Sequence, residues 1–145
     1  MRKMMMLVLV LSTMTLSACS LFQETNNSLQ YADQATEHLN NLADFAAQAP
    51  QQIKEAATNP ETKQELNDRL MALKNEIAQF NLIDAPGYAK DLHRQIVEKN
   101  QVLLDEINQA LAGGNLALDQ LQNSPIISTI TDVTSFMNRI ENLGL

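Results

Sequence analysis

The two histidines are the first side chains to consider for chemistry, because imidazole binds metals and transfers protons near neutral pH. His38 follows Glu37, and His93 lies two residues after Asp91. Brought together across a helix interface, these four side chains would resemble a metal site and support a metal-dependent enzyme. A dinuclear centre in a bundle requires Glu-x-x-His on its helices, however, and a zincin requires His-Glu-x-x-His. Neither spacing occurs. We therefore predict that His38 and His93 lie at the boundary of the core and hold no metal or other cofactor.

Motifs for nucleophilic catalysis or phosphate binding give no better support for an enzyme. No serine lies in a Gly-x-Ser-x-Gly motif. Gly113-Gly114 lacks the Lys-Ser/Thr that follows the glycines of a phosphate-binding loop. A helix end is the simpler interpretation of this glycine pair. We predict that the protein is not an enzyme.

The N-terminus has the layout of an export signal. Arg2 and Lys3 precede an unbroken apolar run over 4–11, which small polar residues then dilute. A membrane-spanning helix needs about 20 mostly apolar residues, and this run is shorter. We predict that residues 1–18 are a signal peptide.

The single cysteine stands where this signal should end. Leu16-Ser17-Ala18-Cys19 is an apolar residue, two small residues and a cysteine, and it resembles the lipobox of bacterial lipoproteins. The resemblance implies that the Cys19 thiol receives a diacylglycerol and that cleavage precedes Cys19. The alternative is an ordinary signal peptide with a chance cysteine nearby. A lone cysteine forms no internal disulfide, and its position is easier to explain by acylation.

Charge limits the partners of the exported chain. Cleavage leaves the segment over 19–145, which is long enough for one domain with its own core. It also removes Arg2 and Lys3, so 8 Lys and Arg face 17 Asp and Glu, a net charge of −9. Nucleic acids and anionic lipid surfaces are bound by clustered basic residues. We therefore expect attachment to membrane lipid through acylated Cys19, where two acyl chains suffice, and no nucleic-acid partner.

The first half of the chain predicts two long helices. Asn26, Asn27 and Ser28 offer N-cap side chains for the first, which Pro50 ends or separates from a short helix over 51–58. Asn59-Pro60, a capping residue before proline, starts the second. The predicted core faces are Leu29, Ala32, Ala35, Leu39, Leu42, Ala43 and Ala46 in the first helix, and Leu66, Leu70, Leu73, Ile77 and Phe80 in the second.

The second half of the chain predicts two more long helices. A turn over 84–87 precedes a third helix, which Lys99 and Asn100 interrupt and which Gly113-Gly114 ends as a left-handed cap. After a short segment with Leu116, Leu118 and Leu121, Ser124-Pro125 opens the last helix. Its β-branched residues would also allow a strand, but the apolar spacing favours a helix. The predicted core faces are Ala89, Leu92, Ile96, Leu103, Ile107 and Ala110 or Leu111 in the third helix, and Ile126, Ile130, Val133, Met137 and Ile140 in the last.

Four long amphipathic helices with short connections should pack antiparallel. We predict an all-α bundle of about four long helices with short extra helical segments. Residues 1–18 would be the signal peptide, 19–25 the lipidated cysteine and a short tether, and 26–145 the bundle domain. Asn and Gln number 27, which indicates either a surface for glycan or peptide or simply a solvated one. Boundary packing is the expected role of Tyr31 and Tyr88.

Several segments together resemble a family of small lipoproteins from Bacillus and relatives. Beyond the lipobox, the matching segments are Asn26–Leu29 with Tyr31, Ala35–Glu37, Phe45–Pro50, Ala85-Pro86, His93–Val97 and Asn123–Ile127. The resemblance implies a Gram-positive host and the outer face of the cytoplasmic membrane. It implies no activity, because that family is uncharacterised. In a Gram-negative host, Ser20 in place of Asp would indicate sorting to the outer membrane.

Three hypotheses for function follow. The first is a non-catalytic, membrane-tethered helical module that binds or scaffolds another envelope protein. The second is a carrier of a small apolar ligand, held between helices where alanine-rich faces leave room. The third is a metal-dependent enzyme that uses His38 and His93.

Overall fold

The computed structural model describes residues 18–143, with side chains from Ser28 onward, and this part of the chain is helical without strands. The predicted signal peptide and lipobox lie almost wholly outside the described residues. No described helix is both long enough and apolar enough to cross a membrane. The elements are α2 (Ala18–Ala56), α3 (Pro60–Phe80), η1 (Gly87–Ala89), α4 (Lys90–Ala110), η2 (Ala112–Gly114), α5 (Leu118–Asn123), α6 (Ile126–Thr134) and α7 (Met137–Glu141).

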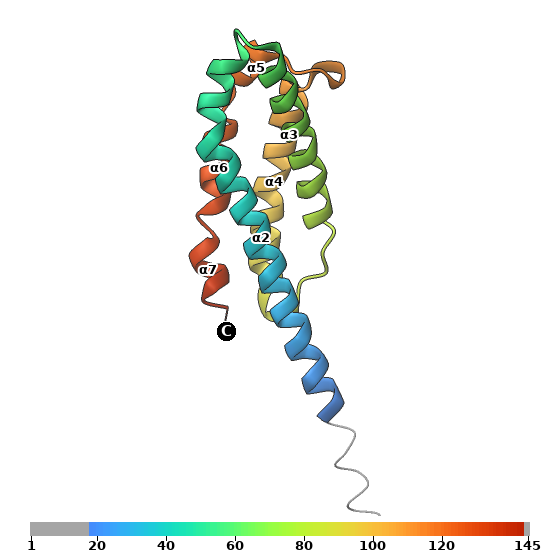
Figure 1. Ribbon diagram of the computed structural model, residues 1–145. Helices are drawn as coiled ribbons and strands as arrows, with labels where there is room; N and C mark the ends of the chain where they lie inside the picture. The colour runs from blue at the N-terminus through green and yellow to red at the C-terminus, as the bar shows by residue number, and fades with distance from the viewer. Residues whose placement is uncertain (1–17, 144–145) are drawn as a thin grey trace, which may run out of the picture.

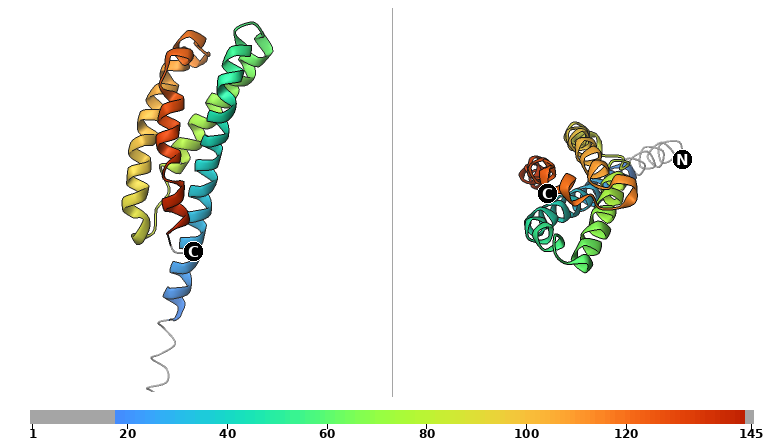
Figure 2. Two further views of the ribbon diagram at one scale, coloured as in Figure 1. Left: turned by 90° about the vertical axis from the view of Figure 1, so that its left-hand side faces the viewer. Right: turned by 90° about the horizontal axis from the view of Figure 1, so that it is seen from above.

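These helices form a four-sided antiparallel bundle, which confirms the predicted fold class. Helix α2 packs against α3 on one side and α6 on the other, and α4 packs against the same two helices. Helix α7 continues the path of α6 beside α2, so the chain ends near the point where α2 leaves the bundle (Figure 1). The N-terminal part of α2 projects beyond the other helices in both side views (Figures 1 and 2).

The core contains nearly all the apolar residues predicted for it. Every predicted core residue of α3, and those predicted from Ala89 to Leu111, is buried. In α2 the prediction is wrong at Leu29, which is half-exposed, and at Ala43, which is exposed. The buried face is instead centred on a series with spacings of 4, 3, 4, 3 and 4 residues, and two of its members carry polar atoms. That series is Tyr31, Ala35, His38, Leu42, Phe45 and Ala49.

Helix α2 is longer than predicted at both ends. It begins at Ala18, so the expected start after Ser28 is wrong, and it continues through Pro50 to Ala56. Proline removes one backbone hydrogen bond, but contacts with α3 hold the helix on both sides of Pro50. The Arg69 guanidinium donates to Oε1 of Gln48 at 3.1 Å and to Oε1 of Gln52 at 2.7 Å. Tertiary contacts therefore outweigh the local signal of Pro50.

The last predicted helix is divided into α6 and α7 by a turn at Ser135 and Phe136. Hydroxyl groups at the start of this turn donate to nearby carbonyl oxygens, Thr134 to Thr131 at 3.1 Å and Ser135 to Asp132 at 2.6 Å. Such local bonds compete with helical ones and explain the interruption. The predicted face is retained across it, since Ile126, Ile130, Val133 and Ile140 are buried and Met137 is half-buried.

The predicted Asn59 cap is confirmed, but the glycine pair does not cap the third helix directly. Helix α4 ends at Ala110 with Leu111 as its cap, and Gly113 and Gly114 lie in η2, where they adopt the predicted left-handed conformation. The backbone φ angles of Gly113 and Gly114 are 64° and 84°. L side chains adopt such positive values only at a cost. At the start of α3, Oδ1 of Asn59 accepts from the backbone N–H of Glu61 at 2.9 Å and of Thr62 at 3.4 Å. These bonds satisfy donors that the first helical turn leaves free.

We expect Asn59→Ala to lower the free energy of unfolding by about 1 kcal/mol, because the cap is lost. Asn59→Asp retains an acceptor at the same place and should be nearly neutral. Urea denaturation of the two variants beside the parent protein measures the difference, and equal stability of Asn59→Ala and parent would contradict the capping role.

Candidate functional site

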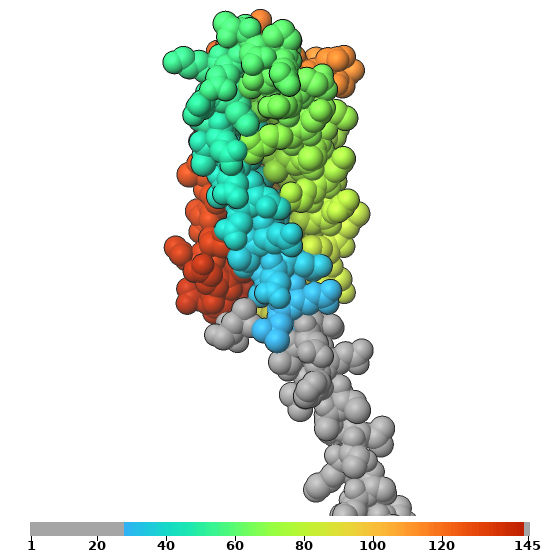
Figure 3. Space-filling model, viewed as in Figure 1, coloured from blue at the N-terminus to red at the C-terminus, as the bar shows by residue number. Residues whose placement is uncertain are grey.

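A groove follows the seam between α2 and α3, two helices that lie side by side on the face shown in Figure 3. It consists of three hollows of about 470, 380 and 300 Å³ in order along the seam. Adjacent hollows share lining residues, Gln34 and Ile83 in one case and Asn41 and Glu76 in the other. We call this feature the α2–α3 groove; it lies between positions 30–48 of α2 and 69–80 of α3, and reaches the loop over 83–87.

The rim of the groove on α2 is a polar stripe with helical spacing. It lies beside the buried face of α2 and consists of Gln30, Gln34, Glu37, Asn41, Asp44 and Gln48, all exposed. The spacing of 4, 3, 4, 3 and 4 residues places these side chains in one row. The groove thus gathers amide and carboxylate groups that can bond to a polar ligand or a polypeptide, above a lining that includes the apolar side chains Phe45, Phe80 and Ile83.

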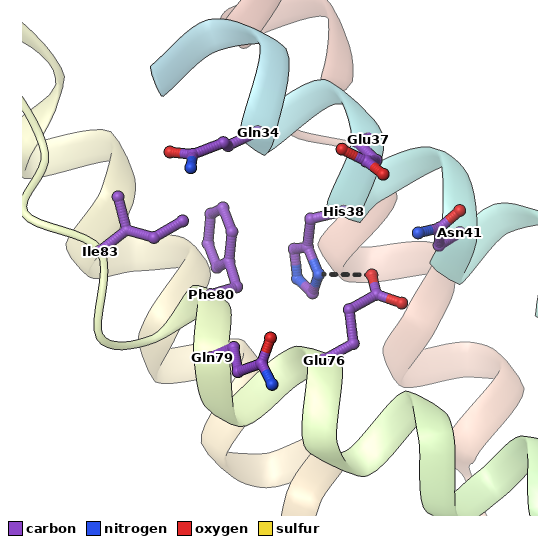
Figure 4. A pocket seen from close by; sticks show the side chains of 8 residues that line it. All are labelled: Gln34, Glu37, His38, Asn41, Glu76, Gln79, Phe80 and Ile83. Carbon is purple, nitrogen blue, oxygen red and sulfur yellow. Dashed lines mark hydrogen bonds and ion pairs between the residues drawn. The ribbon is translucent and has the colours of Figure 1, made fainter. Parts of the chain in front are cut away.

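The floor of the central hollow is formed by His38 and Phe80 (Figure 4). Their rings stack with centroids 4.1 Å apart and an angle of 12° between planes. Nδ1 of His38 lies 3.4 Å from Oε1 of Glu76, the contact marked in Figure 4. The imidazole is 3% exposed, so only its edge at Glu76 borders the groove.

Behind this floor, His38 joins a buried chain of hydrogen bonds. Nε2 of His38 lies 3.1 Å from Nδ2 and 3.3 Å from Oδ1 of Asn100, and Nδ2 of Asn100 donates to Oδ1 of Asn81 at 2.8 Å. An amide nitrogen has two hydrogens, so it can serve both acceptors when Nε2 is unprotonated. Nδ1 then carries the proton and donates toward Glu76. The network connects α2, α4 and the end of α3 beneath the groove.

A second buried pair, Tyr31 and His93, adjoins this network. Their rings meet edge to face with centroids 5.6 Å apart, and His93 also lies 5.1 Å from Phe80. Among the described residues, neither the Tyr31 hydroxyl nor Nδ1 of His93 has a hydrogen-bond partner. Burial, with a smaller effect of Tyr88, raises the pKa of Tyr31 to about 12. Burial, and then the proximity of His38, lowers the pKa of His93, while Asp84 acts in the opposite direction.

The lowered pKa of His93 makes folding sensitive to mild acid. Above the usual pKa of 6.5, His93 is neutral in both the folded and the unfolded chain, and its burial has no pH-dependent effect on the free energy of unfolding. As the pH falls below 6.5, the unfolded chain takes up a proton that the folded chain resists, so stability decreases.

We expect a His93→Gln variant to show a smaller loss of stability between pH 7 and pH 5 than the parent. Urea denaturation at several pH values measures this loss. Parallel stability curves for both proteins would rule out the contribution of His93.

The structure corrects three predictions about polar residues. His38 and His93 are buried, at 3% and 9% exposure, and do not lie at the core boundary. Tyr31 is buried too, whereas Tyr88 is half-exposed. Asn100 does not interrupt the third helix, because α4 runs unbroken through it and the side chain is fully buried.

A signal for these buried polar residues was present in the sequence. His38, His93 and Asn100 each fill a position at helical spacing within an apolar face, as Asn100 does between Ile96 and Leu103. In the described part of the chain, no three His, Cys, Asp or Glu side chains gather as a metal ion would require. Cys19 lies at the start of α2, and its acylation remains a prediction.

The fold and the site define the class of protein. It is an all-α bundle with an amide-rich groove between its first two helices. Residues 31–143 match the family described as "Family of unknown function (DUF6376)", and the chain belongs to that family. It is 27% identical over 129 residues to "Uncharacterized lipoprotein YybP" of Bacillus subtilis (strain 168), a match that covers 87% of each chain. The resemblance to uncharacterised Bacillus lipoproteins is thereby confirmed. No solved structure matches the chain significantly.

Proposed function

We propose that this protein is a lipoprotein anchored through acylated Cys19 to the extracytoplasmic face of the membrane, with a non-catalytic bundle that binds another envelope protein. The observation that carries the proposal is the dual role of α2. One continuous helix starts beside the acylation site and, within the bundle, forms a wall of the α2–α3 groove. The lipid anchor and the binding surface therefore share one helix.

The geometry of α2 supports display of the groove away from the lipid. The helical segment over 19–27 precedes the bundle. At about 1.5 Å per residue it spans roughly 13 Å. The groove begins at Gln30 and extends along α2 to Gln48, further from the anchor. Its amide and carboxylate rim suits the hydrogen-bonding groups of a polypeptide, and it favours this function over the carriage of an apolar ligand.

The anchor is tested by Cys19→Ala. We expect the parent protein, expressed in a Gram-positive host, to enter the detergent phase on phase separation and to carry the mass of a diacylglycerol. The variant should do neither, because no other cysteine is present to accept the lipid. Equal partitioning of parent and variant would contradict anchoring through Cys19.

The groove is tested by placing a photoreactive amino acid at Gln79, an exposed position that lines the central hollow. Gln109, exposed on α4 outside the groove, is the matched control. We expect crosslinks to one envelope protein from position 79 but not from 109, and their loss with Cys19→Ala. The same products from both positions would argue against binding in the groove.

A further inference from the structure

Exposed apolar side chains gather at one end of the bundle. Leu82, in the turn after α3, is 85% exposed, while Tyr88 in η1 is 48% exposed and Leu29 on α2 is 46% exposed. The Tyr88 hydroxyl donates to the backbone carbonyl oxygen of Ser28 at 3.3 Å. This bond holds the loop between α3 and α4 against the segment of α2 that carries Leu29.

This end of the bundle is the end from which α2 projects toward Cys19 (Figure 1). The helical segment over 19–27 lies between the two, and it separates them by roughly 13 Å. If Cys19 carries acyl chains, as the proposed function requires, the end of the bundle that holds this loop and the end of α7 faces the lipid (Figure 1). A tilt of α2 toward the loop over 81–89 would carry that loop to the headgroup layer.

We propose that Leu29, Leu82 and Tyr88 form a membrane-contacting rim that rests in the headgroup region of the bilayer. A leucine gains free energy when its apolar surface leaves water, and a tyrosine ring suits the interface because its body is apolar and its hydroxyl polar. Acidic Asp84 and Asp91 and basic Lys90 and Arg94 offset one another around the loop.

The rim sets the orientation of the bundle on the membrane. Two acyl chains already hold a protein at a bilayer, so three side chains add little to attachment. They do restrict how the bundle leans about α2, which fixes the direction in which the α2–α3 groove faces. A bilayer is favoured over a second copy of the chain because the anchor holds this end beside lipid.

The absence of tryptophan from the sequence allows a direct test. Leu82→Trp introduces a single reporter at the rim, and Met71→Trp introduces one at a position 43% exposed on α3, more than two helical turns away. Each acylated protein is reconstituted into vesicles of phosphatidylcholine and phosphatidylglycerol, with and without brominated lipid. We expect brominated lipid to lower the emission of Leu82→Trp about two-fold and leave that of Met71→Trp nearly unchanged.

The outcomes of this experiment test the membrane-contacting rim and the lipid anchor independently. Vesicle-bound Leu82→Trp protein with unquenched emission would overturn the rim while leaving the anchor intact. Emission shifted to the blue without quenching by brominated lipid would also overturn it, because it indicates contact with a second copy. Acylated protein that does not sediment with vesicles would overturn both the anchor and the rim.

Discussion

Phe80→Ala should lower the free energy of unfolding by about 3–5 kcal/mol, the largest effect we expect from a single substitution. The Phe80 ring is 3% exposed, at the point where α3 meets α2 and α4. It stacks on His38 and contacts His93. Truncation removes this packing and leaves a cavity beneath the groove that two imidazoles cannot fill without moving.

Leu82→Ala is the matched control, because Leu82 lies two residues away and is largely exposed. We expect it to change stability by less than about 0.5 kcal/mol. Urea denaturation, followed by helical circular dichroism, measures both variants. A loss below about 1 kcal/mol for Phe80→Ala would mean that the aromatic cluster contributes little to the core.

Asn100→Ala should lower the free energy of unfolding by about 2–3 kcal/mol, because it strands the buried His38 imidazole and also removes the partner of half-buried Asn81. Asn100 is fully buried, and its amide is the group that joins His38 to Asn81. Without the amide, Nε2 of His38 and Oδ1 of Asn81 lose these bonds inside the bundle. An unpaired buried polar group is more costly than the net value of the hydrogen bond it replaces.

Asn108→Ala is an exposed substitution of the same type on the same helix and provides the control. It should change stability by less than about 0.5 kcal/mol. The double variant Asn81→Ala with Asn100→Ala tests the network itself. We expect it to be more stable than the sum of the single effects predicts, by about 0.5 kcal/mol or more, because the two side chains share a bond. Strict additivity would show that they act independently.

The buried network also links stability to the proposed binding surface. His38 and Phe80 are both members of the core and the floor of the α2–α3 groove. A substitution at either residue therefore changes groove shape and fold together. Exposed residues that line the α2–α3 groove, such as Gln34 and Gln79, are better positions for separating binding from stability.

Local and periodic features of the sequence determined most of the fold. The apolar series of α3 and α4 is buried as predicted, because a helix with one apolar face can satisfy it only by packing that face inward. The Asn59 cap acts as predicted, and the glycine pair after α4 is left-handed as predicted although it lies in η2 beyond the Leu111 cap. Each feature depends on the conformation of a few neighbouring residues. The lipobox-like segment is recognisable from the sequence alone, and it predicts that the protein is attached to the membrane.

Tertiary structure decided the features that depend on neighbours distant in sequence. Arg69 holds Gln48 and Gln52 on both sides of Pro50, so a helix predicted to stop continues. Asn100, predicted as an interruption, is buried because His38 and Asn81 on other elements satisfy its amide. The α2–α3 groove likewise exists only where two helical faces meet. Periodicity shows which face of a helix is buried, but the partners that make a buried polar group stable are set by packing.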